Sequence, residues 1–171
     1  MNQQLATLQM NLTGTLEELV RLYRALLETV RREKDILVSS NLDDLNENNR
    51  AKEAILIKVQ GIEEARVAQA VELSAAFGIA TDAPRLLEIA RHSGGEIGDR
   101  FRNFHSVLEI LLKRVHELNK ENETLVQSAL QHVTGAMKAI RETLQEKPTY
   151  QRKGEVSAGP APTGNLVSRE A

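Results

Sequence analysis

Apolar residues recur along this chain at every third or fourth position, which is the spacing of one face of an α-helix. The longest such pattern begins at Phe101 and ends at Leu144. No proline interrupts it, and its one glycine, Gly135, costs a helix only about 1 kcal/mol relative to alanine. A helix of this length, roughly 65 Å at 1.5 Å per residue, needs other long helices to lie against. The apolar positions of the pattern are Phe101, Phe104, Leu108, Leu111, Val115, Leu118, Leu125, Ala129, Val133, Ala136, Ile140 and Leu144.

One polar residue, Asn122, stands within this apolar pattern, and Asn119 precedes it by about one turn. In the seam of a coiled coil such an asparagine more often fixes the register of the helices than performs chemistry. We therefore expect Asn122 to be structural.

Two further helical patterns precede the long one. The first runs from about residue 3 to Ser39 and the second from about Leu42 to Phe77. Between them, Ser40 or Asn41 is suited to cap the second helix, and acidic residues follow in its first turn. Because the connection is so short, the two helices are expected to form an antiparallel hairpin.

A short helix is predicted between the hairpin and the long final helix. Gly78 follows the expected end of the second helix, where glycine readily adopts a left-handed conformation. Pro84 suits a first helical turn, which predicts a helix from Pro84 to about Arg91. The sequence Ser93-Gly94-Gly95 breaks that helix, and the final helix is expected to begin near Glu96.

These elements predict an all-α fold: a long antiparallel helical hairpin, a short helix and a long C-terminal helix, together an elongated three-helix bundle or coiled coil. Residues 1–146 are expected to form this bundle. Residues 147–171 contain three prolines, three glycines and few apolar side chains, so we predict a disordered C-terminal tail.

The composition supports long helices over a compact globular core. Only 3% of the residues are aromatic and there is no tryptophan. The formal net charge is −2 with both signs interspersed, so no basic surface for nucleic acid is expected. The first twenty residues do not resemble a signal peptide, and no run of about 18 apolar residues is present. We therefore expect a cytoplasmic protein without membrane insertion.

The sequence contains no convincing constellation for catalysis, metal binding or cofactor binding. Cysteine is absent, and the four histidines do not pair with carboxylates at metal-ligand spacing. His105 or His116 on a bundle helix could accept a phosphoryl group, as in histidine phosphotransfer domains, but surface positions are the more ordinary role. We predict no enzymatic activity and no cofactor.

Several residues in this chain resemble the FlgN family of flagellar chaperones, which serve the hook–filament junction proteins. In the hairpin the matching positions are Glu33, Lys34, Leu37, Leu45, Lys52, Leu56 and Arg66. In the last helix, LNKENETLVQSALQHV is similar to the family's Asn-x-x-Asn-x-x-Leu-[Leu/Val] stretch at Asn119, Asn122, Leu125, Val126 and Leu130. Tyr150 followed by Gly154 also resembles the family's C-terminal region, and the resemblance covers roughly residues 15–155.

The resemblance implies a cytoplasmic, non-enzymatic chaperone of flagellar type III export. It implies binding to the C-terminal segments of hook-associated proteins, prevention of their premature assembly, and delivery to the export gate.

Because three helices of unequal length leave one end unpaired, we expect this client to dock on the second half of the last helix. Tyr150 is a candidate contact for the client or the gate. The predicted client-binding residues are Leu125, Val126, Ala129, Leu130, Val133, Met137, Ile140 and Leu144.

Two alternatives stay open at the level of sequence. A structural coiled-coil adaptor without an export role has the same periodicity and associates with itself as concentration rises. A phosphotransfer bundle using His105 or His116 requires a kinase partner.

Overall fold

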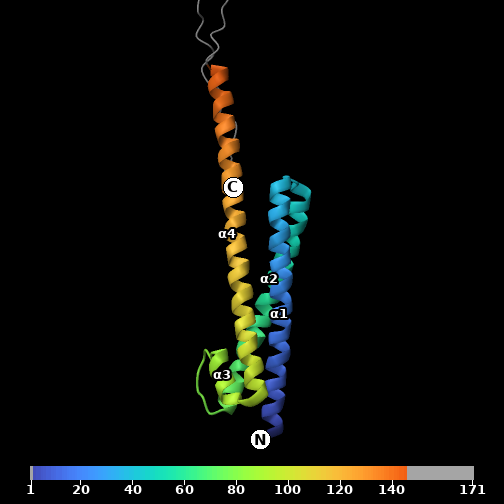
Figure 1. The fold of residues 1–171 in the computed structure, drawn as a ribbon, viewed down its shortest axis with the longest axis vertical. Helices are drawn as coiled ribbons and strands as arrows, with labels where there is room; N and C mark the ends of the chain where they lie inside the picture. Colours follow the sequence, from blue (N-terminus) through green and yellow to red (C-terminus); the bar gives the residue numbers. More distant parts are fainter. Residues whose placement is uncertain (1, 146–171) are drawn as a thin grey trace, which may run out of the picture. The chain divides into compact units, whose positions relative to one another are not determined.

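The computed structural model describes residues 2–145, and every regular element in that range is an α-helix. The helices are α1 (Asn2–Ser39), α2 (Leu42–Ala76), α3 (Leu86–Ser93) and α4 (Gly95–Gln145), which confirms the all-α prediction (Figure 1). The chain divides into two units: residues 1–125 hold α1, α2, α3 and the first part of α4, and the second begins at Val126. The predicted tail and Tyr150 lie outside the described residues.

The hairpin of α1 and α2 turns at Ser40 and Asn41, as the capping pattern predicted. Ser40 adopts a positive φ of 58°, which reverses the chain. The Asn41 side chain accepts hydrogen bonds from the backbone N–H groups of Asp43 and Asp44, at 3.1 and 3.3 Å. These bonds satisfy two of the free N–H groups at the start of α2, and the two acidic side chains favour its positive end.

The core of the first unit consists of two apolar clusters. The first joins all four helices, because α1, α2, α3 and α4 each contribute fully buried side chains; it contains Leu12, Leu16, Ala70, Leu73, Ile89, Ala90 and Phe101. The second lies between α1 and α4 and contains Val20, Leu26, Leu27, Val30, Leu111, Val115 and Leu118. Burying one such leucine or valine contributes about 1.5–3 kcal/mol. The first part of α4 is therefore held along α1 mainly by aliphatic packing.

The position of α3 corrects the sequence prediction. The helix begins at Leu86 instead of Pro84, because Arg85 is its N-cap and keeps an extended backbone (φ −84°, ψ 133°). It continues to Ser93 instead of ending at Arg91, and Gly94 terminates it with φ 61° while donating its N–H to the Ala90 carbonyl at 3.2 Å. The glycine pair therefore ends α3 as expected, but two residues later than the predicted Arg91, and the start predicted at Pro84 is wrong.

Close approach of α3 and α4 depends on Gly98. A Cβ atom at this position would overlap the backbone carbonyl oxygen of Ala90, which is itself fully buried. Backbone atoms cannot move aside as the end of a flexible side chain does. Gly98 is therefore the residue that lets α3 dock on the first turns of α4.

Replacing Gly98 with alanine is expected to lower the free energy of unfolding by about 1–3 kcal/mol, because the added methyl group forces α3 away from α4. Gly61→Ala in α2 is the matched control, since a methyl group there would have no atom within 4 Å. That change should raise stability by about 0.5–1 kcal/mol through helix propensity. Urea unfolding followed by circular dichroism measures both, and stabilisation by both substitutions would contradict the packing argument.

Candidate functional site

Beyond Leu125, the described side chains of α4 are exposed to solvent up to Leu144. The large apolar ones range from 48% exposed at Val126 to 72% at Leu144. We call the apolar set in this segment the distal stripe; it contains Val126, Ala129, Leu130, Val133, Met137, Ile140 and Leu144. Contiguous apolar exposure of this extent is typical of an interaction surface.

The distal stripe occupies one side of its helix. Its large residues follow one another at steps of four, three, four, three and four, so at 100° per residue they fall within a sector of roughly 80°. The same spacing lets a second helix insert side chains between them. Every predicted client-binding residue except Leu125 belongs to this stripe, and Leu125, 37% exposed, is the last residue of the first unit.

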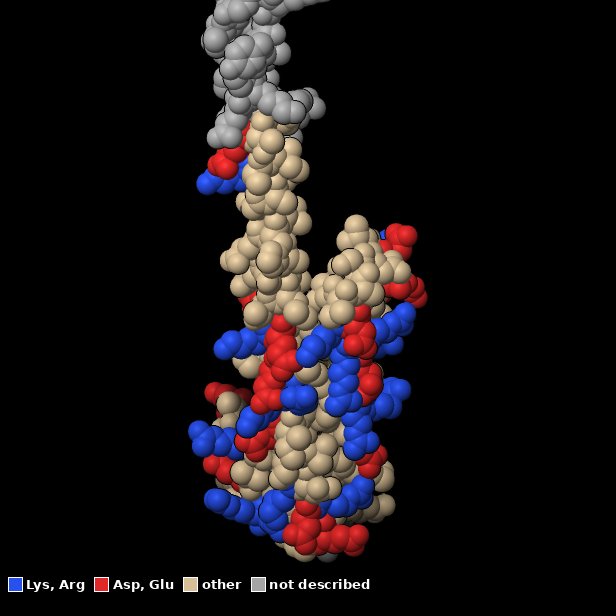
Figure 2. Space-filling model, turned by 45° about the horizontal axis from the view of Figure 1, so that its top comes forward, with Lys and Arg blue, Asp and Glu red and all other residues tan. Residues whose placement is uncertain are grey.

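Few charges surround the distal stripe. Among residues 126–145 the charged side chains are Lys138, Arg141 and Glu142, and Lys138 lies 3.9 Å from Glu142. Figure 2 shows this uncharged surface on the upper part of α4, in contrast to the mixed charges elsewhere on the visible face. Recognition by the stripe would therefore depend on apolar complementarity far more than on electrostatic steering.

A polar cluster lies at the end of the first unit, where α4 leaves its buried seam. Asn122 is 4% exposed, and its Nδ2 donates to the Val30 carbonyl and to Glu33 Oε2, both at 3.0 Å. Lys52 Nζ donates to the same Glu33 oxygen at 2.8 Å and to Asn119 Oδ1 at 3.0 Å. Glu33 thus connects side chains from α1, α2 and α4, and the expectation that Asn122 is a structural seam residue agrees with its position.

An exposed ion pair lies beside this cluster. Lys34 Nζ donates to Glu121 Oε2 at 2.8 Å, and this hydrogen bond and charge lower the pKa of the Glu121 carboxyl group. Exposed pairs of this kind contribute little to stability. The pair adds a second polar contact between α1 and α4, whereas the Glu33 cluster is the more enclosed one.

The histidines do not form a shared site. His92 lies against the ring of Phe77 with centroids 5.8 Å apart, and His105 Nδ1 is 4.0 Å from Glu109. His116 and His132 are exposed. Across residues 2–145 no group of three His, Cys, Asp or Glu side chains is placed to hold a metal ion. Within the same residues, the helices fall short of the length and apolarity that a membrane span requires.

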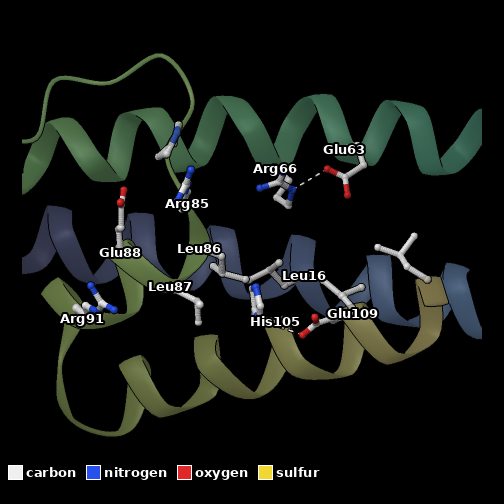
Figure 3. A pocket seen from close by; sticks show the side chains of 13 residues that line it. Leu16, Glu63, Arg66, Arg85, Leu86, Leu87, Glu88, Arg91, His105 and Glu109 are labelled. Carbon is white, nitrogen blue, oxygen red and sulfur yellow. Dashed lines mark hydrogen bonds and ion pairs between the residues drawn. The ribbon is translucent and has the colours of Figure 1, made fainter.

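The sequence pattern did not reveal a groove that the first unit forms between α2, α3 and α4 (Figure 3). Its volume is about 670 Å³. Leu86, Leu87, Leu108 and Leu112 supply apolar walls, while arginines from α2 and α3 and carboxylates from each helix border it. Periodicity could not predict this groove, because it depends on where the short helix α3 docks.

Comparison with protein-family models matches residues 1–158 of this chain to the model described as FlgN protein. No curated protein and no solved structure matches it. The family match covers α1 to α4 and agrees with the resemblance seen in the hairpin and the last helix.

Replacing Glu33 with alanine is expected to lower the free energy of unfolding by about 1–3 kcal/mol, because the Asn122 amide and the Lys52 ammonium group lose a shared, half-buried acceptor. Glu28→Ala is the control, since it removes the exposed ion pair with Arg31 on the same helix. The control should cost less than about 0.5 kcal/mol. Chemical unfolding of both variants tests this, and equal losses would mean that the cluster adds nothing beyond a surface ion pair.

Proposed function

This chain belongs to the FlgN family of flagellar export chaperones, and we propose that its client is the C-terminal segment of the hook–filament junction proteins. The chaperone binds this segment in the cytoplasm, keeps it from assembling before secretion, and delivers it to the flagellar type III export gate. The observation that carries the proposal is the exposed distal stripe of α4.

The size of the stripe suits reversible binding. Covering a half-exposed Val, Leu, Ile or Met side chain contributes on the order of 1 kcal/mol. Its six large residues, together with the client's own apolar side chains, offset the several kcal/mol that association costs. A micromolar complex needs only about −8 kcal/mol. Such a complex protects the client yet releases it at the gate.

The spacing of the stripe also indicates the shape of the client. Residues one helical turn apart form a row that accepts an amphipathic helix with its own anchors at i, i+3, i+4 and i+7. A terminal segment that is unfolded before assembly can gain helical structure on this row, and its ordering entropy further weakens the affinity.

Tyr150 is proposed as a contact for the client or the export gate. It lies outside the described residues, five positions after the end of α4. A single aromatic side chain following the client site is suited to anchor a second contact, because it contributes a large apolar area with few rotatable bonds.

Calorimetric titration of the full chain with the C-terminal segment of a junction protein tests the proposal. We expect micromolar binding, and we expect Val133→Asp with Ile140→Asp to weaken it at least about 100-fold, because two carboxylates would have to enter an apolar interface. The matched control is Ser128→Asp with Gln131→Asp, which adds the same charge to the opposite side of the helix. The control should bind within about twofold of the unchanged chain.

Equal weakening by both double variants would contradict docking on the distal stripe. A fall in helicity or in unfolding free energy for Val133→Asp with Ile140→Asp would show instead that these residues belong to a core. If the unchanged chain ignores the client but associates with itself as its concentration rises, the structural adaptor becomes the better-supported function.

Tyr150→Ala is expected to weaken binding either to the client or to the purified export gate, with a rise of about tenfold in Kd for the affected partner. Tyr150→Phe is the control, because it retains the ring. Calorimetry with each partner separates the two roles. Unchanged affinity for both would remove Tyr150 from the proposed function.

A further inference from the structure

The groove between α2, α3 and α4 has a second kind of surface, in which apolar walls lie next to charged groups. Leu87 and Leu112 are 38% and 46% exposed, although both line this concave region. Leu86 and Leu108 lie beside them and are partly buried. Figure 3 shows Leu86 and Leu87 of α3 directed toward the space above α4. The space therefore has room and apolar contact area for one or two aliphatic side chains.

The walls of this groove are held in place. Ile89 and Ala90 of α3 are fully buried in the four-helix cluster, and Gly98 permits the close approach of α4. His92 stacks at a tilt on Phe77, next to the end of α2. A short helix fixed at this many points keeps its outward face in one arrangement, which lowers the entropy cost of binding.

The charges around the groove are unevenly distributed. Arg66 is paired with Glu63, whose Oε2 accepts from Arg66 Nε at 2.6 Å. Arg85 and Arg91 have no ion pair among residues 2–145, and both border the groove from the α3 side.

Two other carboxylates border the groove. Glu88 of α3 is the acidic residue near Arg85 and Arg91, while Glu109 lies beside His105 on α4 (Figure 3). The α3 end of the groove thus presents two unpaired guanidinium groups against one carboxylate.

We propose that this groove is a second binding site, for a short segment of another protein that carries one or two aliphatic side chains followed by acidic residues. The aliphatic side chains contact Leu87 and Leu112, and the acidic residues bind Arg85 and Arg91. Guanidinium groups suit this role, because each can donate two parallel hydrogen bonds to one carboxylate. The site differs from the distal stripe in chemistry, since it combines apolar contact with charge recognition.

A double-mutant cycle tests the proposed charge contact in the full chain. The probe is a fluorescein-labelled synthetic peptide with two leucines one turn apart followed by three glutamates, and its companion has glutamines in place of the glutamates. We expect Arg85→Glu with Arg91→Glu to weaken binding of the glutamate peptide about tenfold or more. The glutamine peptide should bind the unchanged chain about tenfold more weakly than the glutamate peptide does. When the arginine substitutions and the glutamine peptide are combined, Kd should rise by less than the product of the two separate increases, because both changes remove the same contact.

Matched variants distinguish binding in this groove from binding elsewhere on the chain. Arg24→Glu with Arg50→Glu makes the same change in net charge at exposed positions outside the groove and should leave the affinity within about twofold. Leu112→Asp should weaken binding of both peptides at least about tenfold. Val133→Asp with Ile140→Asp should have no effect, so failure of client docking on the distal stripe and failure of this proposal are distinguishable.

Four results would overturn the proposal. They are equal binding of the two peptides, an equal loss in the control arginine variant, loss of binding in the stripe variant but not in Leu112→Asp, and absence of saturable binding at about 1 mM peptide. Displacement of the probe by a peptide of residues 146–171 would make the chain's own C-terminal segment the occupant, and would overturn the assignment to another protein.

Discussion

The structure depends on the packing of α4 along α1, which continues only as far as Asn122. Before that residue, Leu111, Val115 and Leu118 of α4 are covered by aliphatic side chains from α1. At Asn122 the contacts become polar, with the Val30 carbonyl, Glu33 and Lys52 joined through shared hydrogen bonds. A buried amide tolerates little displacement, because its hydrogen-bonding groups cannot return to water without breaking contacts. The cluster therefore fixes which residues of α4 belong to the seam.

The chain carries two surfaces of different chemistry as a result. The distal stripe is apolar with few charges nearby, which suits a client that must be covered and later released. The groove beside α3 is held by buried contacts, and two of the arginines that border it, Arg85 and Arg91, have no ion pair in the described part of the chain. In the proposed complexes, apolar area would supply much of the affinity at the first surface, whereas charge placement would contribute more of the selectivity at the second. For a FlgN family chaperone, two such surfaces would permit contact with more than one partner.

Much of the helical framework could be predicted from the sequence, because its determinants are local. Asn41 caps α2 as its side-chain chemistry required, Gly78 has the expected positive φ of 76°, and the glycine pair ends α3. The start of α3 was predicted wrongly, because Pro84 is compatible with a first helical turn but equally with the extended connection that Arg85 completes. The groove was missed since it arises from contacts between residues far apart in the sequence, and from the close approach of Gly98 to Ala90 at a helix–helix crossing.

By itself the sequence determined the helices, their capping and the continuous apolar periodicity from Phe101 to Leu144, since these follow from residue spacing and local hydrogen bonding. Unequal helix lengths also indicated that apolar surface would remain on the last helix. Only the tertiary structure decided which residues are buried and which are exposed. Leu118 and Val133 both belong to the same periodic pattern, yet Leu118 is 4% exposed and Val133 61%. The reason is physical: periodicity places a side chain on a face, but burial requires another helix alongside that face.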